Sequence, residues 1–138
     1  MTTAPPHLAE QLRRLLANAH APYSGVQVAA AIETPDGSLH FGVNVENAAY
    51  PQGVCAEASA ISAAVTGGKP EIVRVFLASS LPDPIWPCGG CRQKIFELAR
   101  AGCEVVTTAP DGRSEMQTIE ALLPLGFRLE PGARNPAK

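Results

Sequence analysis

The sequence predicts an α/β fold on three observations: a helical pattern opens the chain, a hairpin pattern follows, and strand-like and helical runs then alternate. Apolar residues recur every three or four positions after Pro5-Pro6, so we expect a helix that ends near His20. Pro35-Asp36-Gly37 is a turn sequence between two apolar runs, Gln27–Ile32 and Leu39–Val43, and it predicts a β-hairpin.

The rest of the chain continues this alternation of helices and strands. Alanine-rich and apolar-periodic segments predict helices over Ala56–Val65 and Gly89–Ala101, the second closed by Gly102. Short apolar runs bounded by turn residues predict strands, and a helical turn follows the last of them. These segments are Val73–Ala78, Val105–Thr108, Glu115–Thr118 and the turn Ile119–Leu123, with loops at Asn44–Gly53 and Ser79–Pro87.

Length and charge limit the architecture and the partners. A chain of 138 residues with 46% hydrophobic content predicts one domain over residues 1–138, with Pro131–Lys138 as a flexible tail. A formal charge of -2 with scattered Lys and Arg argues against a nucleic-acid partner. There is no signal-like start and no apolar run near the roughly 20 residues that span a bilayer. We therefore expect a soluble, cytoplasmic protein without a membrane partner.

Three of the four cysteines fall where helices are expected to begin. Cys55 precedes the second helix, and Cys88 and Cys91 open the third. Helix N-termini stabilise the thiolates that zinc requires, and a catalytic zinc site uses three protein ligands with a fourth position for water. If the third helix is unbroken, Cys103 lies about 18 Å beyond Cys91, so we expect it in the core.

Each of these features has a simpler interpretation when it is taken alone. The Cys88-Gly89-Gly90-Cys91 pair fits a structural zinc or redox site as well as a catalytic one. Glu57 fits a solvated carboxylate in the first turn of a helix, which the helix dipole favours. The combination of Cys55-Ala56-Glu57 with this pair is more specific, because it supplies three ligands and an additional carboxylate.

The combined motifs resemble those of the small zinc cytidine deaminases of nucleoside salvage. The matching segments are Asn44-Val45-Glu46-Asn47-Ala48-Ala49-Tyr50-Pro51, Cys55-Ala56-Glu57 and Pro87-Cys88-Gly89-Gly90-Cys91-Arg92-Gln93. The pair Cys-x-Glu and Pro-Cys-x-x-Cys is the all-cysteine form of the zinc-deaminase signature. The resemblance implies a three-layer α/β/α domain with a five-stranded mixed sheet. It also implies a homotetramer whose active sites draw on neighbouring subunits.

The resemblance further implies the chemistry of the site. Cys55, Cys88 and Cys91 would hold Zn²⁺, which activates water for attack on C4 of cytosine, while Glu57 moves the protons and ammonia leaves. Other residues would bind the small-molecule nucleoside or support the metal. Asn44 and Glu46 would hold the ribose, and backbone groups near Ala56 and Pro87 would contact the base. Tyr50 and Phe127 would contact the nucleoside across a subunit boundary. Arg92 would donate hydrogen bonds to the cysteine sulfurs. From residue type alone, Asn44 and Glu46 fit an ordinary polar loop, and a single Phe fits the core.

Two departures from the family pattern leave the substrate open. Ala58 follows Glu57 where the family commonly has Arg, and Val26 stands where Phe is often found. A roomier pocket fits N4-substituted cytidines or an aminonucleoside of the blasticidin S type, although the retained Asn44 and Glu46 favour a ribose. A zinc-stabilised binding module without catalysis and a cytosine editor of RNA or DNA are the remaining alternatives. The acidic charge and 5% aromatic content argue against the editor.

Overall fold

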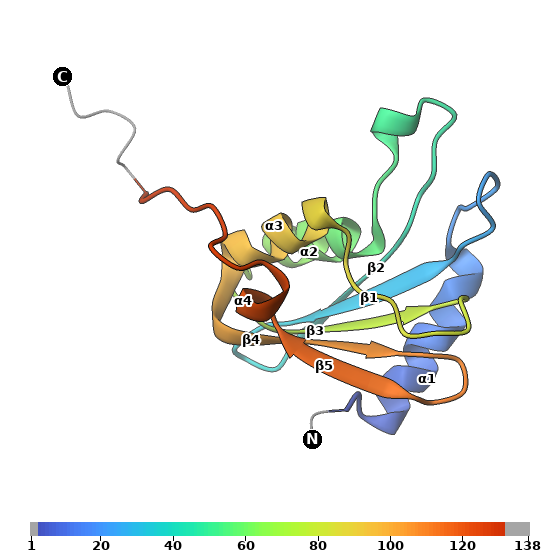
Figure 1. Cartoon of the computed structure of the whole chain (residues 1–138), viewed down its shortest axis with the longest axis horizontal. Coiled ribbons are helices and arrows are strands. Elements are labelled where there is room, and N and C mark those ends of the chain that lie inside the picture. Colours follow the sequence, from blue (N-terminus) through green and yellow to red (C-terminus); the bar gives the residue numbers. More distant parts are fainter. Residues whose placement is uncertain (1–2, 132–138) are drawn as a thin grey trace.

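The computed structural model describes residues 3–131, which form a five-stranded sheet between helices (Figure 1). The elements in chain order are α1 (Pro6–Leu15), β1 (Val28–Glu33), β2 (Leu39–Val43), α2 (Ala56–Thr66), β3 (Ile72–Ser79), α3 (Gly89–Leu98), β4 (Ala99–Thr108), β5 (Ser114–Thr118) and α4 (Ile119–Leu122), with 3₁₀ turns at Leu16–Asn18 and Tyr50–Gln52. The predicted tail lies, apart from Pro131, outside the described residues.

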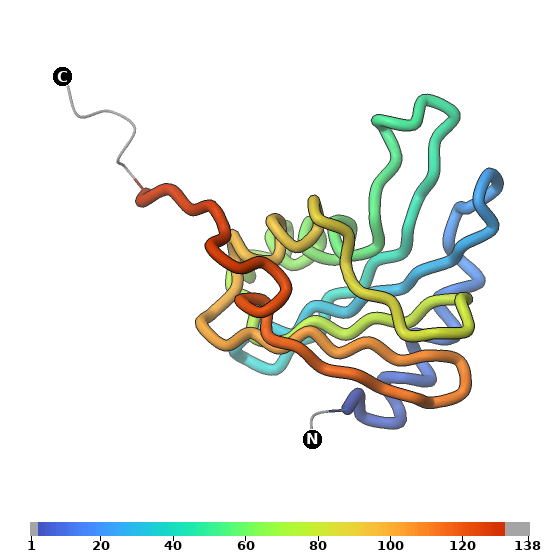
Figure 2. The backbone as a smooth tube through the Cα atoms, viewed as in Figure 1, coloured from blue at the N-terminus to red at the C-terminus, as the bar shows by residue number. Residues whose placement is uncertain are grey.

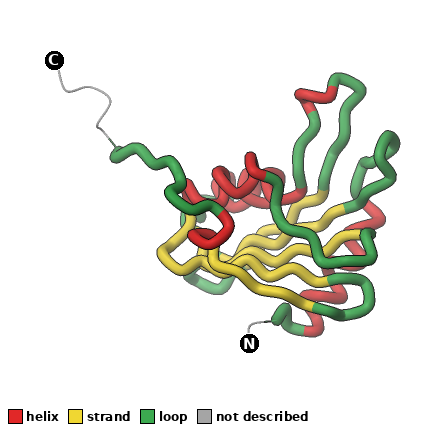
Figure 3. Tube along the Cα trace, viewed as in Figure 1, coloured by secondary structure: helices red, strands yellow, loops and turns green. Residues whose placement is uncertain are grey.

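The sheet is mixed, as predicted. Its strand order is β2-β1-β3-β4-β5, in which β3 and β4 are parallel and the other neighbours are antiparallel. Helix α1 covers one face and α2, α3 and α4 lie on the other, so the three-layer α/β/α arrangement is confirmed (Figures 1 and 3).

Alternation along the central strands builds two cores. On β1, Ala30 and Ile32 pack toward α2 and α3, whereas Ala29 and Ala31 pack toward α1. Successive strand residues point to opposite faces of a sheet, so one strand serves both layers. The small alanines let helices approach closely on both sides, and α2 packs on β2 and β1 beside α3.

The hairpin prediction is confirmed. Strands β1 and β2 pair antiparallel around the turn, where Gly37 has a φ of 79° that favours glycine. The Asp36 carboxylate accepts hydrogen bonds from the Thr34 and Ser38 hydroxyls and forms an ion pair with Lys69. The turn is therefore held by its own side chains.

The prediction that the third helix continues to Ala101 is wrong. Helix α3 ends at Leu98, and β4 begins at Ala99 without an intervening loop. The Arg128 guanidinium donates hydrogen bonds to the carbonyl oxygens of Phe96 and Ala99 and lies 4.4 Å from the Phe96 ring centre. This cap comes from the far end of the chain, and tertiary contacts of this kind override local helix propensity.

Gly42 makes the closest approach between β2 and α2. A methyl group at this position would clash with backbone atoms of Ala56 and Ala60 and would lie 2.7 Å from Cβ of Ser59. We predict that Gly42→Ala lowers the free energy of unfolding by about 1–3 kcal/mol, because the added methyl overpacks the interface. Chemical denaturation measures this. Gly67→Ala, at the residue that follows the end of α2, is the control, since its methyl meets other atoms at 3.5 Å; equal losses in both variants would contradict the packing argument.

Candidate metal centre

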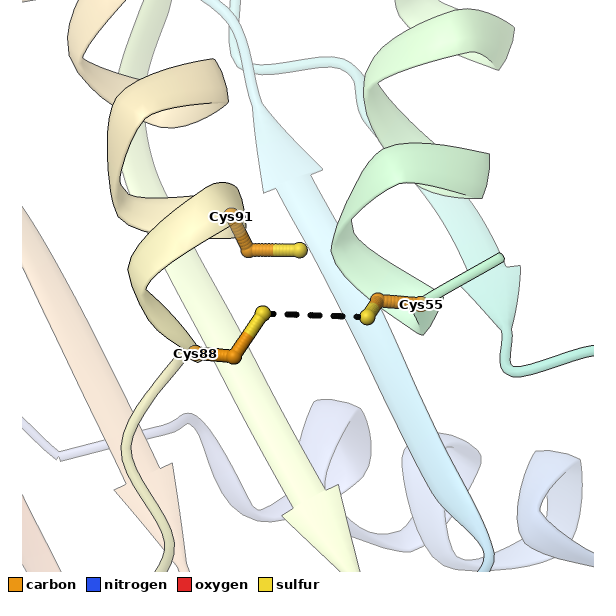
Figure 4. Close-up of side chains that lie close together, drawn as sticks. All are labelled: Cys55, Cys88 and Cys91. Atoms are coloured by element: carbon orange, nitrogen blue, oxygen red, sulfur yellow. Dashed lines mark hydrogen bonds between the residues drawn. The ribbon is translucent and has the colours of Figure 1, made fainter. Parts of the chain in front are cut away.

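Two neighbouring helix starts carry the three cysteines. Cys55 directly precedes α2, Cys88 directly precedes α3, and Cys91 lies in the first turn of α3. Their side chains point into the space between the two helix starts (Figure 4). The backbone N–H groups of both first turns face the same region and favour negative charge there.

The spacing of the sulfur atoms fits zinc. All three Sγ atoms lie within 4.8 Å of one another, and Sγ of Cys55 lies 3.8 Å from Sγ of Cys88. A tetrahedral zinc with Zn–S bonds of about 2.3 Å places its sulfur ligands about 3.8 Å apart. Within residues 3–131 these cysteines are the single group of side chains suited to holding a metal ion. Cys55 and Cys88 are exposed, so a fourth position would face solvent.

The thiols are electrostatically unequal. Contacts with Cys91 and then Cys88, together with the charge of Lys94, lower the pKa of Cys55 to about 6. The contact with Cys55, followed by burial and the nearby Glu57, raises the pKa of Cys91. The surroundings therefore favour the thiolate form at Cys55 over that at Cys91.

Cys103 lies in the core, as predicted, but for a different reason. It sits on β4, is 1% exposed, and packs in the same cluster as Ile95 and Ile119. Burial raises the pKa of this thiol to about 12. The basis of the prediction, an unbroken third helix, was wrong; the sheet buries Cys103 instead.

Glu57 is a buried carboxylate beside the thiols. It is the second residue of α2 and is only 5% exposed. Burial raises its pKa, and the negative charge of Cys55 adds to this, while Cys91 and the charge of Lys94 act in the opposite direction. A carboxyl group whose pKa is raised toward neutrality is suited to accept and donate protons.

A family model described as the cytidine and deoxycytidylate deaminase zinc-binding region matches residues 6–107. This chain belongs to that family. The cytidine deaminase of Halalkalibacterium halodurans is 38% identical to it over 112 residues, which span 81% of this chain and 85% of that protein. The match places the cysteine cluster and Glu57 inside the zinc-binding region of a deaminase.

Solved structures of this family share the fold. The crystal structure of cytidine deaminase from Burkholderia pseudomallei matches with a TM-score of 0.83 and 36% identity, covering 89% of this chain and 99% of that one. Cytidine deaminase from Mycobacterium leprae matches with a TM-score of 0.72 and 38% identity, covering 83% of this chain and 92% of that one. The resemblance seen in the sequence is thus confirmed at the level of family and fold.

Asn44 and Glu46 join two segments that lie side by side (Figure 2). Asn44 accepts a hydrogen bond from the backbone N–H of Val28 and donates one to the carbonyl of Val26. Glu46 accepts from the hydroxyl and N–H of Ser24 and the N–H of Tyr23, and the Ser24 hydroxyl is the largest cause of its lowered pKa. Both side chains keep further hydrogen-bonding capacity.

The two predicted aromatic contacts are exposed in a single chain. Tyr50 is 81% exposed on the loop between β2 and α2, which projects from the body of the protein (Figure 1). Together with Tyr23 and Glu46 it lines a cavity of about 170 Å³. Phe127 is 66% exposed on the segment after α4. The described chain therefore leaves both rings uncovered by its own packing.

Arg92 binds carbonyl groups in this structure. Its Nε donates to the carbonyl oxygen of Pro87 and its Nη1 to that of Leu122, in place of the expected cysteine sulfurs. It thereby holds the peptide just before Cys88 and fixes α4 against α3. Ala56, the expected base-contacting residue, is buried at the start of α2.

The roles of two residues near the site were not predicted from the sequence. Gln93 donates a hydrogen bond to the carbonyl oxygen of Phe127 and anchors the C-terminal segment. Lys94 shares a groove between α2 and α3 with Ala58. Helical spacing is the sequence feature that could have pointed to Lys94, because this residue follows Cys91 by three positions and so lies on the same helix face.

We predict that Cys88→Ser lowers zinc affinity by at least ~100-fold, because loss of a ligand exceeds the 10- to 100-fold effect of outer partners. Zinc content after gel filtration and chelator competition measure this. Cys103→Ser is the matched control and should keep its zinc, since Cys103 lies in the core. Equal zinc loss in the two variants would contradict the ligand assignment.

Proposed function

We propose that this chain hydrolytically deaminates cytidine and deoxycytidine to uridine and deoxyuridine, with release of ammonia. The observation that carries the proposal is the convergence of three thiols within 4.8 Å beside the buried Glu57, inside the region matched by the deaminase family. The named relatives are cytidine deaminases, which favours cytidine over N4-substituted cytidines and blasticidin-like aminonucleosides.

The protein residues divide the work of the reaction. Zinc, when held by Cys55, Cys88 and Cys91, supplies Lewis-acid activation of water for attack on C4 of the cytosine ring. Glu57 takes the proton of that water, passes a proton to ring N3, and later delivers one to the departing amino group. Its burial suits this task, because exclusion of water raises its pKa toward the working pH.

Nucleoside binding would use the loop that precedes α2. The remaining hydrogen-bonding capacity of Asn44 and Glu46 suits the two hydroxyls of a ribose. Backbone groups at Ala56 and Pro87 flank the cysteine motifs and would contact the base edge. Arg92 supports this role by holding the Pro87 carbonyl in place.

The other classes of function have less support. A non-catalytic zinc module leaves the burial of Glu57 without a purpose, and residues 3–131 offer no fourth cysteine or histidine ligand within the cluster. A formal charge of -2 disfavours nucleic acid as substrate. No helix among the described residues is long and apolar enough to cross a bilayer. A cytoplasmic location completes the proposal.

We predict that Glu57→Gln keeps zinc and fold but lowers kcat by about 10²- to 10⁴-fold, because an amide cannot transfer the protons. Turnover of cytidine at matched zinc content measures this. Glu115→Gln, an exposed change on β5, is the control and should be fully active. Wild-type turnover by a zinc-loaded Glu57→Gln protein would refute the mechanism.

We also propose a homotetramer with composite active sites. Tyr50, Leu125 and Phe127 are large side chains that are 81%, 103% and 66% exposed in one chain. Large apolar side chains that one chain leaves exposed on its loops are typical of surfaces that another subunit covers. The partner's Phe127 would then complete the nucleoside pocket, in keeping with the family resemblance.

We predict that Phe127→Ala raises KM for cytidine by about 5- to 150-fold, the equivalent of 1–3 kcal/mol of stacking, while zinc content stays unchanged. Steady-state kinetics and sedimentation measure this. Met116→Ala, which removes an exposed apolar side chain from β5, is the control. A fully active monomeric parent in sedimentation would contradict the composite site.

A further inference from the structure

The proposed metal centre carries a negative charge that its surroundings must offset. Three thiolates on Zn²⁺ sum to -1, and an ionised Glu57 makes the site more negative. Two helix N-termini contribute partial positive charge, but these dipoles act only within the first turn. A side-chain cation near the sulfurs would stabilise the site further.

Arg92 does not fill this role, although it directly follows Cys91. Its guanidinium donates to the carbonyl oxygens of Pro87 and Leu122. These contacts direct its charge toward α4 and the peptide before Cys88. The described hydrogen bonds of Arg92 therefore leave the cysteine sulfurs without a contact from this side chain.

The Lys94 side chain extends back along α3 toward the turn that holds the cysteine motif. It is the sixth residue of the helix, and long side chains on a helix point back toward its N-terminus. Its Nζ lies over the first turn, because a methyl group placed on Gly90 would come within 3.6 Å of it. Gly90 stands between Cys88 and Cys91, so the ammonium group lies beside the turn that carries both ligands.

Lys94 has no competing partner in the described part of the chain. No carboxylate there lies within ion-pair distance of its ammonium group, although Glu97 lines the same groove. A helix N-terminus carries partial positive charge and by itself disfavours a nearby cation. The negative charge of the thiolate centre explains why the Lys94 ammonium group lies there. Across the groove, of about 400 Å³, Ala58 contributes only a methyl group and leaves room for the lysine side chain.

We propose that Lys94 is the cation that offsets the charge of the three-cysteine zinc centre, reaching it from α3 through the space that Ala58 leaves open. The inference rests on the proposed zinc site. Lys94 is a positioning residue, since it is assigned no contact with metal or nucleoside and acts through the thiolates and Glu57.

Zinc affinity provides a test that is independent of turnover. Zinc binding replaces thiol protons and makes the site more negative, so a nearby cation favours the bound state. Chelator competition at pH 6 should show about fivefold weaker zinc binding by Lys94→Gln at low salt, as expected for unit charges separated by several ångströms near a surface. This difference should shrink at 1 M salt.

Matched variants separate charge from shape. Lys94→Arg should bind zinc within about twofold of the parent, and adding Ala58→Arg to Lys94→Gln should restore most of the affinity, because each supplies a cation. Lys69→Gln removes an exposed lysine that pairs with Asp36 and should leave zinc affinity unchanged. Equal, salt-independent affinities of the parent and Lys94→Gln would overturn the inference. A parent that binds zinc but does not deaminate cytidine would instead overturn the proposed function.

Discussion

The close approach of α2 and α3 on one face of the sheet is the constraint on which the site depends. Both helices lie on the same face of the sheet, and Gly42 with the alanines of α2 keeps that helix tight against β2. A looser interface would separate Cys55 from Cys88, whose sulfurs now lie 3.8 Å apart. Packing of small residues therefore sets the ligand geometry, and the metal chemistry follows from it.

Charge explains which side chains surround the cysteines. Glu57 is buried next to thiols that become anionic, an arrangement that is costly unless cations or dipoles lie nearby. The helix N-termini meet part of this requirement, and the Lys94 ammonium group lies beside Gly90 in the first turn of α3. Arg92 serves geometry instead, since it ties the Pro87 carbonyl to α4 through Leu122. The two basic residues of α3 thus make different contacts, although they are only two positions apart in the sequence.

Short sequence patterns correctly predicted the structural elements that are determined by neighbouring residues. The hairpin follows from its turn residues, and the cysteines were placed at helix starts by short motifs. The end of α3 was not predictable in this way, because its cap is Arg128, thirty residues beyond Leu98. The carbonyl groups that Arg92 binds and the direction of the Lys94 side chain were not predictable for the same reason. Sequence shows that a side chain can reach a site, but competing partners decide whether it does.

The C-terminal segment after α4 links α3, the helix at which Cys88 and Cys91 lie, to the surface that a neighbouring subunit would cover. Gln93 holds the Phe127 carbonyl, Arg92 holds that of Leu122, and Arg128 caps α3. The exposed Phe127 ring is thereby positioned by the same helix that carries Cys88 and Cys91. In the proposed oligomer, a shift of α3 in one subunit would move the Phe127 ring that this subunit contributes to the nucleoside pocket of its neighbour. The zinc centre of each subunit and the nucleoside pocket of its neighbour would then be coupled through one helix.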